Sequence, residues 1–182
     1  MEKTYRLEVA GVVRELPIIQ ISETLCIASF VILGDTGVVK AAAPRLVERL
    51  PEVDVIVTAE AKGIPLAHEV AHLLGMERYY VARKSIKAYM SDPVVDGVSS
   101  ITTTEKQMLC LDGNDAKAIK GKRVAIVDDV ISTGESLEAL VRLVEAAGGI
   151  ITAKAAILAE GDAARREDII FLGELPLFPI KK

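Results

Sequence analysis

Two adjacent carboxylates, Asp128 and Asp129, come directly after four apolar residues and just before a run of small hydroxyl residues and glycine. The apolar run, 124–127, has the composition of a buried strand, and ligands bind at the carboxyl ends of such strands in open parallel sheets. The residues that follow begin a helix, whose free N–H groups and dipole favour a phosphate. Carboxylates beside a phosphate suit sugar hydroxyls or a hydrated Mg²⁺. The segment therefore predicts a site for a phosphorylated sugar.

The loop after the two acids carries hydroxyl groups and backbone N–H groups that can hold an anion. Ser132, Thr133, Gly134, Glu135 and Ser136 lead into the next helix. A purely structural interpretation assigns the acids to a turn and Ser132 to a helix cap. Two acids directly after four buried apolar residues fit that interpretation poorly, and we favour a functional site.

A second loop combines an acid, a cation and a glycine between a strand and a helix. Glu60, Ala61, Lys62 and Gly63 follow an apolar strand and begin a helix. Gly63 permits close approach of a ligand to the backbone, and Lys62 adds positive charge. We therefore include this loop among the candidate binding segments.

Three cations gather at the end of another strand. Arg83 and Lys84 end the strand, and Lys87 follows three residues later. The structural alternative is a solvated strand end. In a chain whose formal net charge is −4, however, this local positive charge is better explained by a strongly anionic ligand.

In this order, the segments resemble the type I phosphoribosyltransferases. The stretch 124–136, VAIVDDVISTGES, resembles their motif for phosphoribosyl pyrophosphate (PRPP), the stretch 58–64 resembles their pyrophosphate loop, and the Arg-Lys pair is similar to one in adenine and xanthine enzymes. The resemblance covers about residues 53–160. It implies an α/β fold with a central parallel sheet flanked by helices and a small hood lobe formed by the terminal segments.

The resemblance also implies a role for each matching residue. Asp128 and Asp129 would hold the ribose hydroxyls and contact Mg²⁺ through water or the ribose. PRPP would also be bound by the residues of the loop that follows, Val130, Ile131, Ser132, Thr133, Gly134, Glu135 and Ser136. Its pyrophosphate would lie near the residues of the other two segments, Glu60, Ala61, Lys62, Gly63, Arg83, Lys84 and Lys87. Five residues are expected to be catalytic: Asp128, Asp129, Arg83, Lys87 and Glu105.

The base pocket matches the family less well. The segment 84–104 has little periodicity and is typical of a lid that excludes water. Adenine-specific members carry a glutamate in the lid, whereas the nearest match in register here is Thr103, with Glu105 two residues on. Xanthine-type members place an aromatic residue shortly after a glutamate like Glu160, and this chain has none there. The base-binding candidates are Phe30, Val130 and Glu160.

The activity implied is a Mg²⁺-dependent purine phosphoribosyltransferase that transfers the 5-phosphoribosyl group from PRPP to a purine base. The products are a nucleoside monophosphate and pyrophosphate, as in purine salvage. Adenine is the first expectation for the base. A xanthine or hypoxanthine/guanine enzyme and a non-catalytic PRPP-binding regulatory protein remain alternatives. We also expect a homodimer.

One motif points to different chemistry. His68-Glu69-Val70-Ala71-His72 matches H-E-x-x-H, the zinc metalloprotease signature, and contains both histidines of the chain. On a helix, His68 lies at the flank of the apolar stripe, and Glu69 and His72 fall on the solvent side. Because no downstream histidine supplies a third ligand, zinc hydrolysis is the weaker interpretation.

The elements that must position these residues alternate between strand and helix. Expected strands cover 53–59, 78–83, 124–127 and 151–158, and expected helices cover 38–50, 64–74 and 135–147. An extended arm is expected over 99–111. Alternation of this kind implies a parallel sheet with right-handed crossovers.

The length of 182 residues fits a single phosphoribosyltransferase domain. We expect a core over about 38–160 and a hood from 1–37 and 161–182, with strand-like pieces at 16–21, 26–33 and 169–172. The apolar content of 51% argues against disorder. No apolar run is long enough to span a bilayer, and the acidic net charge argues against nucleic acid as a partner. Two distant cysteines in apolar contexts indicate reduced thiols and a cytoplasmic location.

Overall fold

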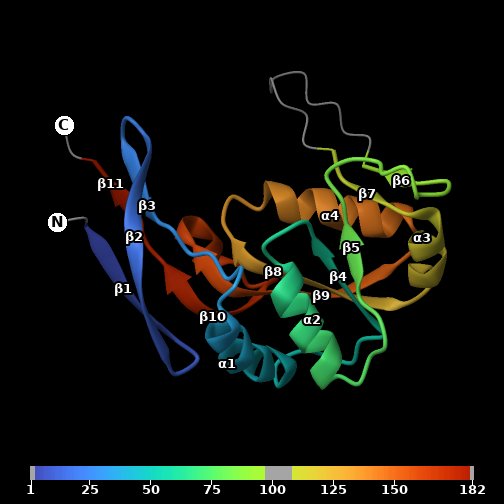
Figure 1. Cartoon of the computed structure of the whole chain (residues 1–182), viewed down its shortest axis with the longest axis horizontal. Coiled ribbons are helices and arrows are strands. Elements are labelled where there is room, and N and C mark those ends of the chain that lie inside the picture. The colour runs from blue at the N-terminus through green and yellow to red at the C-terminus, as the bar shows by residue number, and fades with distance from the viewer. Residues whose placement is uncertain (1–2, 97–107, 181–182) are drawn as a thin grey trace.

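A parallel sheet of five strands forms the centre of the computed structural model, which describes residues 3–96 and 108–180 (Figure 1). The strand order is β10-β9-β8-β4-β5, and every neighbouring pair is parallel. The strands are β4 (Val55–Ala59), β5 (Tyr80–Ala82), β8 (Arg123–Ile131), β9 (Ile150–Glu160) and β10 (Ile170–Leu175). The predicted fold class is confirmed.

Helices cover both faces of this sheet, α1 and α2 on one face and α4 on the other (Figure 1). The helices are α1 (Thr36–Val47), α2 (Ile64–Leu73), α3 (Gly113–Ile119) and α4 (Glu135–Ala146). In β8, Ala125 and Val127 join the core under α1 and α2, whereas Val124 and Ile126 join the core under α3 and α4. Burial on both faces explains why the strand reads as an unbroken apolar run.

The hood is a four-stranded antiparallel sheet with the order β1-β2-β3-β11. Its strands are β1 (Thr4–Val9), β2 (Val12–Ser22), β3 (Leu25–Ala28) and β11 (Leu177–Pro179). Both ends of the chain lie on this side of the molecule (Figure 1). The hood therefore joins segments from the two ends of the chain, as predicted.

The predicted boundary of the hood differs from the structure at its C-terminal side. The segment 161–182 was expected to belong wholly to the hood, but β10 pairs with β9 and completes the central sheet. Among the described residues of this segment, β11, which follows the 3₁₀ turn η1 (Gly161–Arg165) and β10, is the part that pairs with a hood strand. The strand at 169–172 was expected from its composition, but its partner depends on long-range pairing that composition does not encode.

A small antiparallel sheet stands beside β5, formed by β6 (Val94–Val95) and β7 (Cys110–Leu111). Arg83, just past β5, bridges to Cys110 with N–O distances of 2.8 and 2.9 Å. The arm expected over 99–111 lies mostly outside the described residues, as do Thr103 and Glu105.

Within the described ranges, no helix is both long and apolar enough to cross a membrane.

Candidate active site

The two predicted ligand loops lie on either side of the point where the sheet changes direction. Chain connections carry β4 toward β5 on one side, while β8 leads to β9 on the other. β4 and β8 are paired only over residues 55–57 and 124–126. Beyond that pairing the strands lead into the loops 60–63 and 132–136, so both loops lie at the carboxyl ends of neighbouring strands, and we call the region between them the crevice. In open α/β sheets, this switch point is where ligands bind.

The two adjacent acids, Asp128 and Asp129, lie within β8 and not after it. The strand was expected to end at Val127, but its pairing with β9 continues through Ile131. Asp129 is 2% exposed, and its Oδ2 lies 3.0 Å from Lys62 Nζ. Asp128 Oδ1 accepts a hydrogen bond of 2.8 Å from the backbone N–H of Asp129. The last part of the strand thus presents one buried and one half-buried carboxylate to the crevice.

The environment of Asp128 disfavours its charged form. Burial, followed by the neighbouring charge of Asp129, raises the pKa of Asp128 to about 7. The Lys62 ammonium opposes this shift but does not reverse it. A cationic or hydrogen-bond-donating ligand at this edge would therefore be favoured, because it relieves the repulsion between the two acids.

Gly63 brings the first loop into direct contact with β8. A Cβ added at Gly63 would lie 2.4 Å from Thr58 Oγ1 and 2.9 Å from Asp128 Oδ1. Contacts this short leave no room for any side chain. The Thr58 hydroxyl is fully buried and has no hydrogen-bond partner among the described residues. The peptide bond between Glu60 and Ala61, at the start of this loop, is cis.

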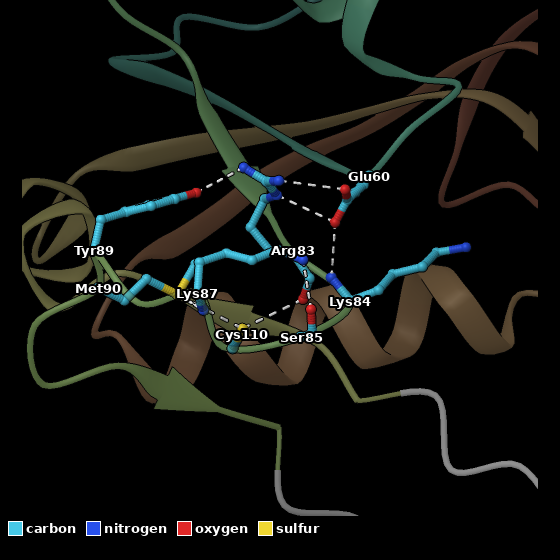
Figure 2. Close-up of polar contacts among 8 residues, drawn as sticks. All are labelled: Glu60, Arg83, Lys84, Ser85, Lys87, Tyr89, Met90 and Cys110. Carbon is cyan, nitrogen blue, oxygen red and sulfur yellow. Dashed lines mark hydrogen bonds and ion pairs between the residues drawn. The ribbon is translucent and has the colours of Figure 1, made fainter.

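Glu60 joins the first loop to the Arg-Lys pair (Figure 2). Its carboxylate accepts hydrogen bonds from Arg83 Nε at 3.1 Å, Arg83 Nη2 at 3.4 Å and the Lys84 backbone N–H at 3.0 Å. The Lys84 N–H, and then the Arg83 guanidinium, lower the pKa of Glu60. Arg83 Nη1 donates to the Tyr89 hydroxyl at 2.8 Å. All three guanidinium nitrogens therefore make hydrogen bonds, and Arg83 links the first loop, through Glu60, to the loop that carries Tyr89.

The two lysines of this segment differ in how they are held. Lys87 Nζ donates to Ser85 Oγ at 2.6 Å, and the Lys87 backbone N–H lies 3.4 Å from Met90 Sδ. Lys84 is exposed, and its side chain extends away from Arg83 (Figure 2). Within the described part of the chain, the Lys84 ammonium makes no ion pair and is available to an anion.

The second loop ends at the start of α4. Gly134 adopts a left-handed φ of 88° and accepts the first helical hydrogen bond, from Glu138 N at 2.8 Å. Ser132 and Thr133 before it, and Ser136 after it, are exposed. The N–H of Glu135 donates weakly to Thr133 Oγ1 at 3.5 Å. Backbone N–H groups at a helix start, flanked by exposed hydroxyls, have the geometry of a phosphate cradle.

The remaining candidates are spread more widely. Phe30 is 6% exposed and packs in the core with α1 and α2, which leaves little of its ring for stacking on a base. Val130 is half-buried against the same core. Glu160 ends β9, where burial raises its pKa and the Lys62 charge partly offsets the shift. Of these three residues, Glu160 carries a charge, and that charge interacts with Lys62 of the first loop.

The H-E-x-x-H stretch lies on α2 with both histidines exposed. His72 Nδ1 pairs with Glu69 Oε2 at 3.9 Å, and the His68 ring contacts the edge of Tyr79. Among the described residues, no group of three histidine, cysteine or acidic side chains could hold a metal ion. The arrangement lacks the third ligand that a zinc hydrolase needs.

Sequence reasoning did not anticipate the contact of Arg166 with Gly134 or that of Tyr89 with Arg83. Neither Arg166 nor Tyr89 belongs to a motif. Arg166 is distant from Gly134 in the sequence, and Tyr89 lies in a loop without periodicity.

Comparison with known proteins identifies a phosphoribosyl transferase domain over residues 38–172. A hypoxanthine/guanine phosphoribosyltransferase from Methanococcus voltae is 34% identical over 137 residues, covering 75% of this chain and 69% of that protein. An adenine phosphoribosyltransferase from Clostridium botulinum is 32% identical over 146 residues, covering 76% of this chain and 78% of that protein. The crystal structure of adenine phosphoribosyltransferase from Thermoanaerobacter pseudethanolicus matches with a TM-score of 0.70 at 23% identity, covering 87% of this chain and 95% of that chain.

Proposed function

This chain belongs to the phosphoribosyl transferase domain family, and on that premise we propose that it is a purine phosphoribosyltransferase that uses PRPP. The observation that carries the proposal is the contact of the first ligand loop, 60–63, with the two acids of β8 at the switch point. Gly63 leaves no space for a side chain beside Asp128, and Lys62 pairs with Asp129. A cationic loop and a pair of acids so close together can hold the pyrophosphate and the ribose of one ligand.

Each part of PRPP has a chemically matched partner in the proposed complex. The carboxylates of Asp128 and Asp129 accept hydrogen bonds from the ribose hydroxyls. The loop 132–136 holds the 5-phosphate through backbone N–H groups at the start of α4. Lys62 and Lys84 stabilise the pyrophosphate, while Arg83 and Glu60 fix the loop that carries it. Lys87 adds positive charge to the same side of the crevice.

The reaction forms a bond between a nitrogen of the base and C1 of the ribose and breaks the bond from C1 to the pyrophosphate oxygen. The bonding electrons leave with the pyrophosphate, and the base nitrogen loses its proton. Positive charge develops on the ribose ring as negative charge develops on the leaving group. The two carboxylates and the lysines stabilise these opposite charges from fixed positions.

The donor set of this site fits Mg²⁺, which prefers carboxylate oxygens and usually keeps further ligands from water and substrate phosphates. Asp128 and Asp129 would hold the ion through water or the ribose. Two acids alone make an incomplete ligand set, which suits a metal that arrives with the pyrophosphate. When bound, Mg²⁺ neutralises part of the pyrophosphate charge.

We retain adenine as the first substrate to test. The relative from Methanococcus voltae, whose name specifies hypoxanthine and guanine, supports a second candidate specificity for these 6-oxopurines. Glu160 is the residue near the crevice best suited to distinguish adenine from the 6-oxopurines. A carboxylate accepts a hydrogen bond from the 6-amino group of adenine but repels the 6-carbonyl oxygen of a 6-oxopurine.

The decisive experiment incubates the protein with PRPP, Mg²⁺ and each of adenine, hypoxanthine, guanine and xanthine, and measures pyrophosphate release. We expect turnover with at least one base. The variant carrying both Asp128→Asn and Asp129→Asn should lose PRPP binding, whereas Asp162→Asn, an acid that is 95% exposed, should retain it. PRPP binding without turnover on any base would contradict the enzymatic proposal and favour a regulatory protein.

A further inference from the structure

Gly134, in the loop proposed to hold the 5-phosphate, is in direct contact with an arginine from a distant segment. A Cβ added at Gly134 would lie 2.7 Å from Arg166 Nη1. Arg166 follows η1, which leads away from the end of β9. This arginine therefore reaches the loop from the segment between η1 and β10, and a side chain at Gly134 would have to displace it.

The guanidinium of Arg166 is held in a fixed orientation. Nε and Nη2 donate to the two carboxylate oxygens of Asp168 at 2.8 and 2.7 Å, which is a bidentate pair. Nη2 also lies 3.3 Å from Glu138 Oε1. Within 3–96 and 108–180, Nη1 has no hydrogen-bond partner. The carboxylates thus occupy one edge of the guanidinium, and the edge at Nη1 faces the loop.

A second cation contacts the carboxylate that holds Arg166. Lys154 Nζ lies 2.8 Å from Asp168 Oδ2, so Asp168 is shared between two cations. Glu138 also contributes a backbone bond, from its N–H to the carbonyl of Gly134. Arg166 is consequently linked to the loop both by its contact with Gly134 and through the first turn of α4.

We propose that Arg166 is a positioning residue that fixes the 5-phosphate loop through Gly134 and places positive charge behind it. This inference rests on the proposed function, because it assigns the loop 132–136 to the 5-phosphate of PRPP. A guanidinium beside a helix start adds to the dipole that already favours an anion there. The effect should therefore appear in the binding of ligands that carry the 5-phosphate.

The adjacent arginine offers a matched control. Arg165 has the same charge and lies one residue earlier, but it is 86% exposed, and among the described residues it pairs only with the exposed Asp162 at 3.5 Å. Arg165→Gln and Arg166→Gln change the net charge by the same amount. Any difference between them must therefore arise from the position of Arg166.

The test measures binding of ribose 5-phosphate and of pyrophosphate separately, by calorimetry, and KM and kcat with PRPP. Arg166→Gln should raise the dissociation constant for ribose 5-phosphate and the KM for PRPP by about tenfold, with kcat changed by less than about threefold. Pyrophosphate binding should change by less than about twofold. Arg166→Lys, which keeps the charge but not the bidentate fork, should lie between the wild type and Arg166→Gln.

Thermal unfolding of each variant identifies a general loss of structure, and Arg166→Lys provides the second variant if Arg166→Gln does not fold. An unchanged ribose 5-phosphate affinity in the folded variants would overturn the inference while leaving the proposed function intact. Equal losses for ribose 5-phosphate and pyrophosphate would also overturn it, because they would indicate a structural effect on the whole crevice. A wild-type protein that binds neither PRPP nor ribose 5-phosphate would overturn both proposals.

Discussion

Lys62 Nζ lies 3.0 Å from Asp129 Oδ2, and this pair ties the loop after β4 to the end of β8. The two side chains have very different surroundings, because Asp129 is 2% exposed and Lys62 is 49% exposed. A buried carboxylate is thus neutralised by a cation that remains accessible from the crevice. Under the proposed function, this pair would connect the stability of the protein with the binding of the pyrophosphate.

Removing both partners of this pair should destabilise the fold by less than the sum of the two single removals. Lys62→Met leaves a buried carboxylate without its cation, which should lower the free energy of unfolding by about 1–3 kcal/mol, toward the lower end because Lys62 is half-exposed. In Lys62→Met combined with Asp129→Asn, the effects should fall short of additivity by at least about 0.5 kcal/mol. Urea unfolding of the three variants and the wild type measures this coupling.

The pair of Arg165 and Asp162 serves as the control for this cycle, since both side chains are largely exposed. The corresponding variants, Arg165→Met and Asp162→Asn, should show almost no coupling, because exposed ion pairs contribute little. Equal coupling energies in the two cycles would show that burial of Asp129 has no energetic consequence.

Gly63→Ala should damage both the fold and the site. The added methyl would lie 2.4 Å from Thr58 Oγ1 and 2.9 Å from Asp128 Oδ1, so the loop or the strand must move. Overpacking of this kind typically lowers the free energy of unfolding by about 1–3 kcal/mol. We expect a lower melting temperature and weaker PRPP binding, measured by calorimetry.

Gly75→Asn is a suitable control for that substitution. Gly75 has a φ of 70° and open space around it, and asparagine tolerates this conformation better than most residues. Its melting temperature should stay near that of the wild type, and its PRPP affinity should be unchanged. A Gly63→Ala protein that behaves like Gly75→Asn would refute the close contact between loop and strand.

The titration of Asp128 should give the unliganded protein a distinctive pH dependence. Its pKa rises from 3.8 to about 7 on folding, so the folded protein retains a proton that the unfolded chain has lost. The free energy of unfolding should therefore fall as the pH rises through this window and level off above it. Asp128→Asn removes the titrating group and should reduce the decline, which urea unfolding between about pH 5 and about pH 8 would detect. Parallel profiles for the two proteins would contradict the raised pKa.

Much of the central sheet could be predicted because its elements carry local signals. Three strands are apolar runs buried on both faces: β4, β8 and β9. Two helices begin after glycine-containing loops and have an apolar stripe: α2 and α4. The helix α3 was not predicted, since it has only seven residues and begins at a glycine. Its N-terminal cap, Asp112, became evident only from the bond to Asn114 N.

The candidate site was predictable as residue types but not as contacts. The acids, both loops and the cations of the Arg-Lys segment follow from motifs that each occupy a short stretch. The motifs do not reveal that Lys62 pairs with Asp129, or that Arg83 is engaged by Glu60 and Tyr89. Such pairings join separate loops, and their geometry depends on how the strands are ordered in the sheet.

An ion pair between Arg14 and Asp35 links the hood to the core, and its contribution to the free energy of unfolding should depend on pH. Asp35 accepts two hydrogen bonds from Arg14 of β2, at 2.7 and 2.9 Å, and caps α1 by accepting one from Val38 N at 3.1 Å. The Arg14 guanidinium contributes most to lowering the pKa of Asp35, from 3.8 to about 2. A lowered carboxylate pKa stabilises the fold above the unfolded value, and this contribution is lost as the pH falls through the folded value.

Asp35→Asn should isolate this contribution, because asparagine is also a good helix cap but carries no charge. At about pH 7 the variant should unfold at a lower urea concentration than the wild type, and the two midpoints should converge as the pH falls from about 4 to about 2. Glu8→Gln, which removes the exposed pair with Arg6, should show little difference at any pH. A gap between Asp35→Asn and the wild type that stays constant down to the lowest pH would mean that Asp35 acts only as a cap. Convergence would instead show that its charge holds the hood to α1.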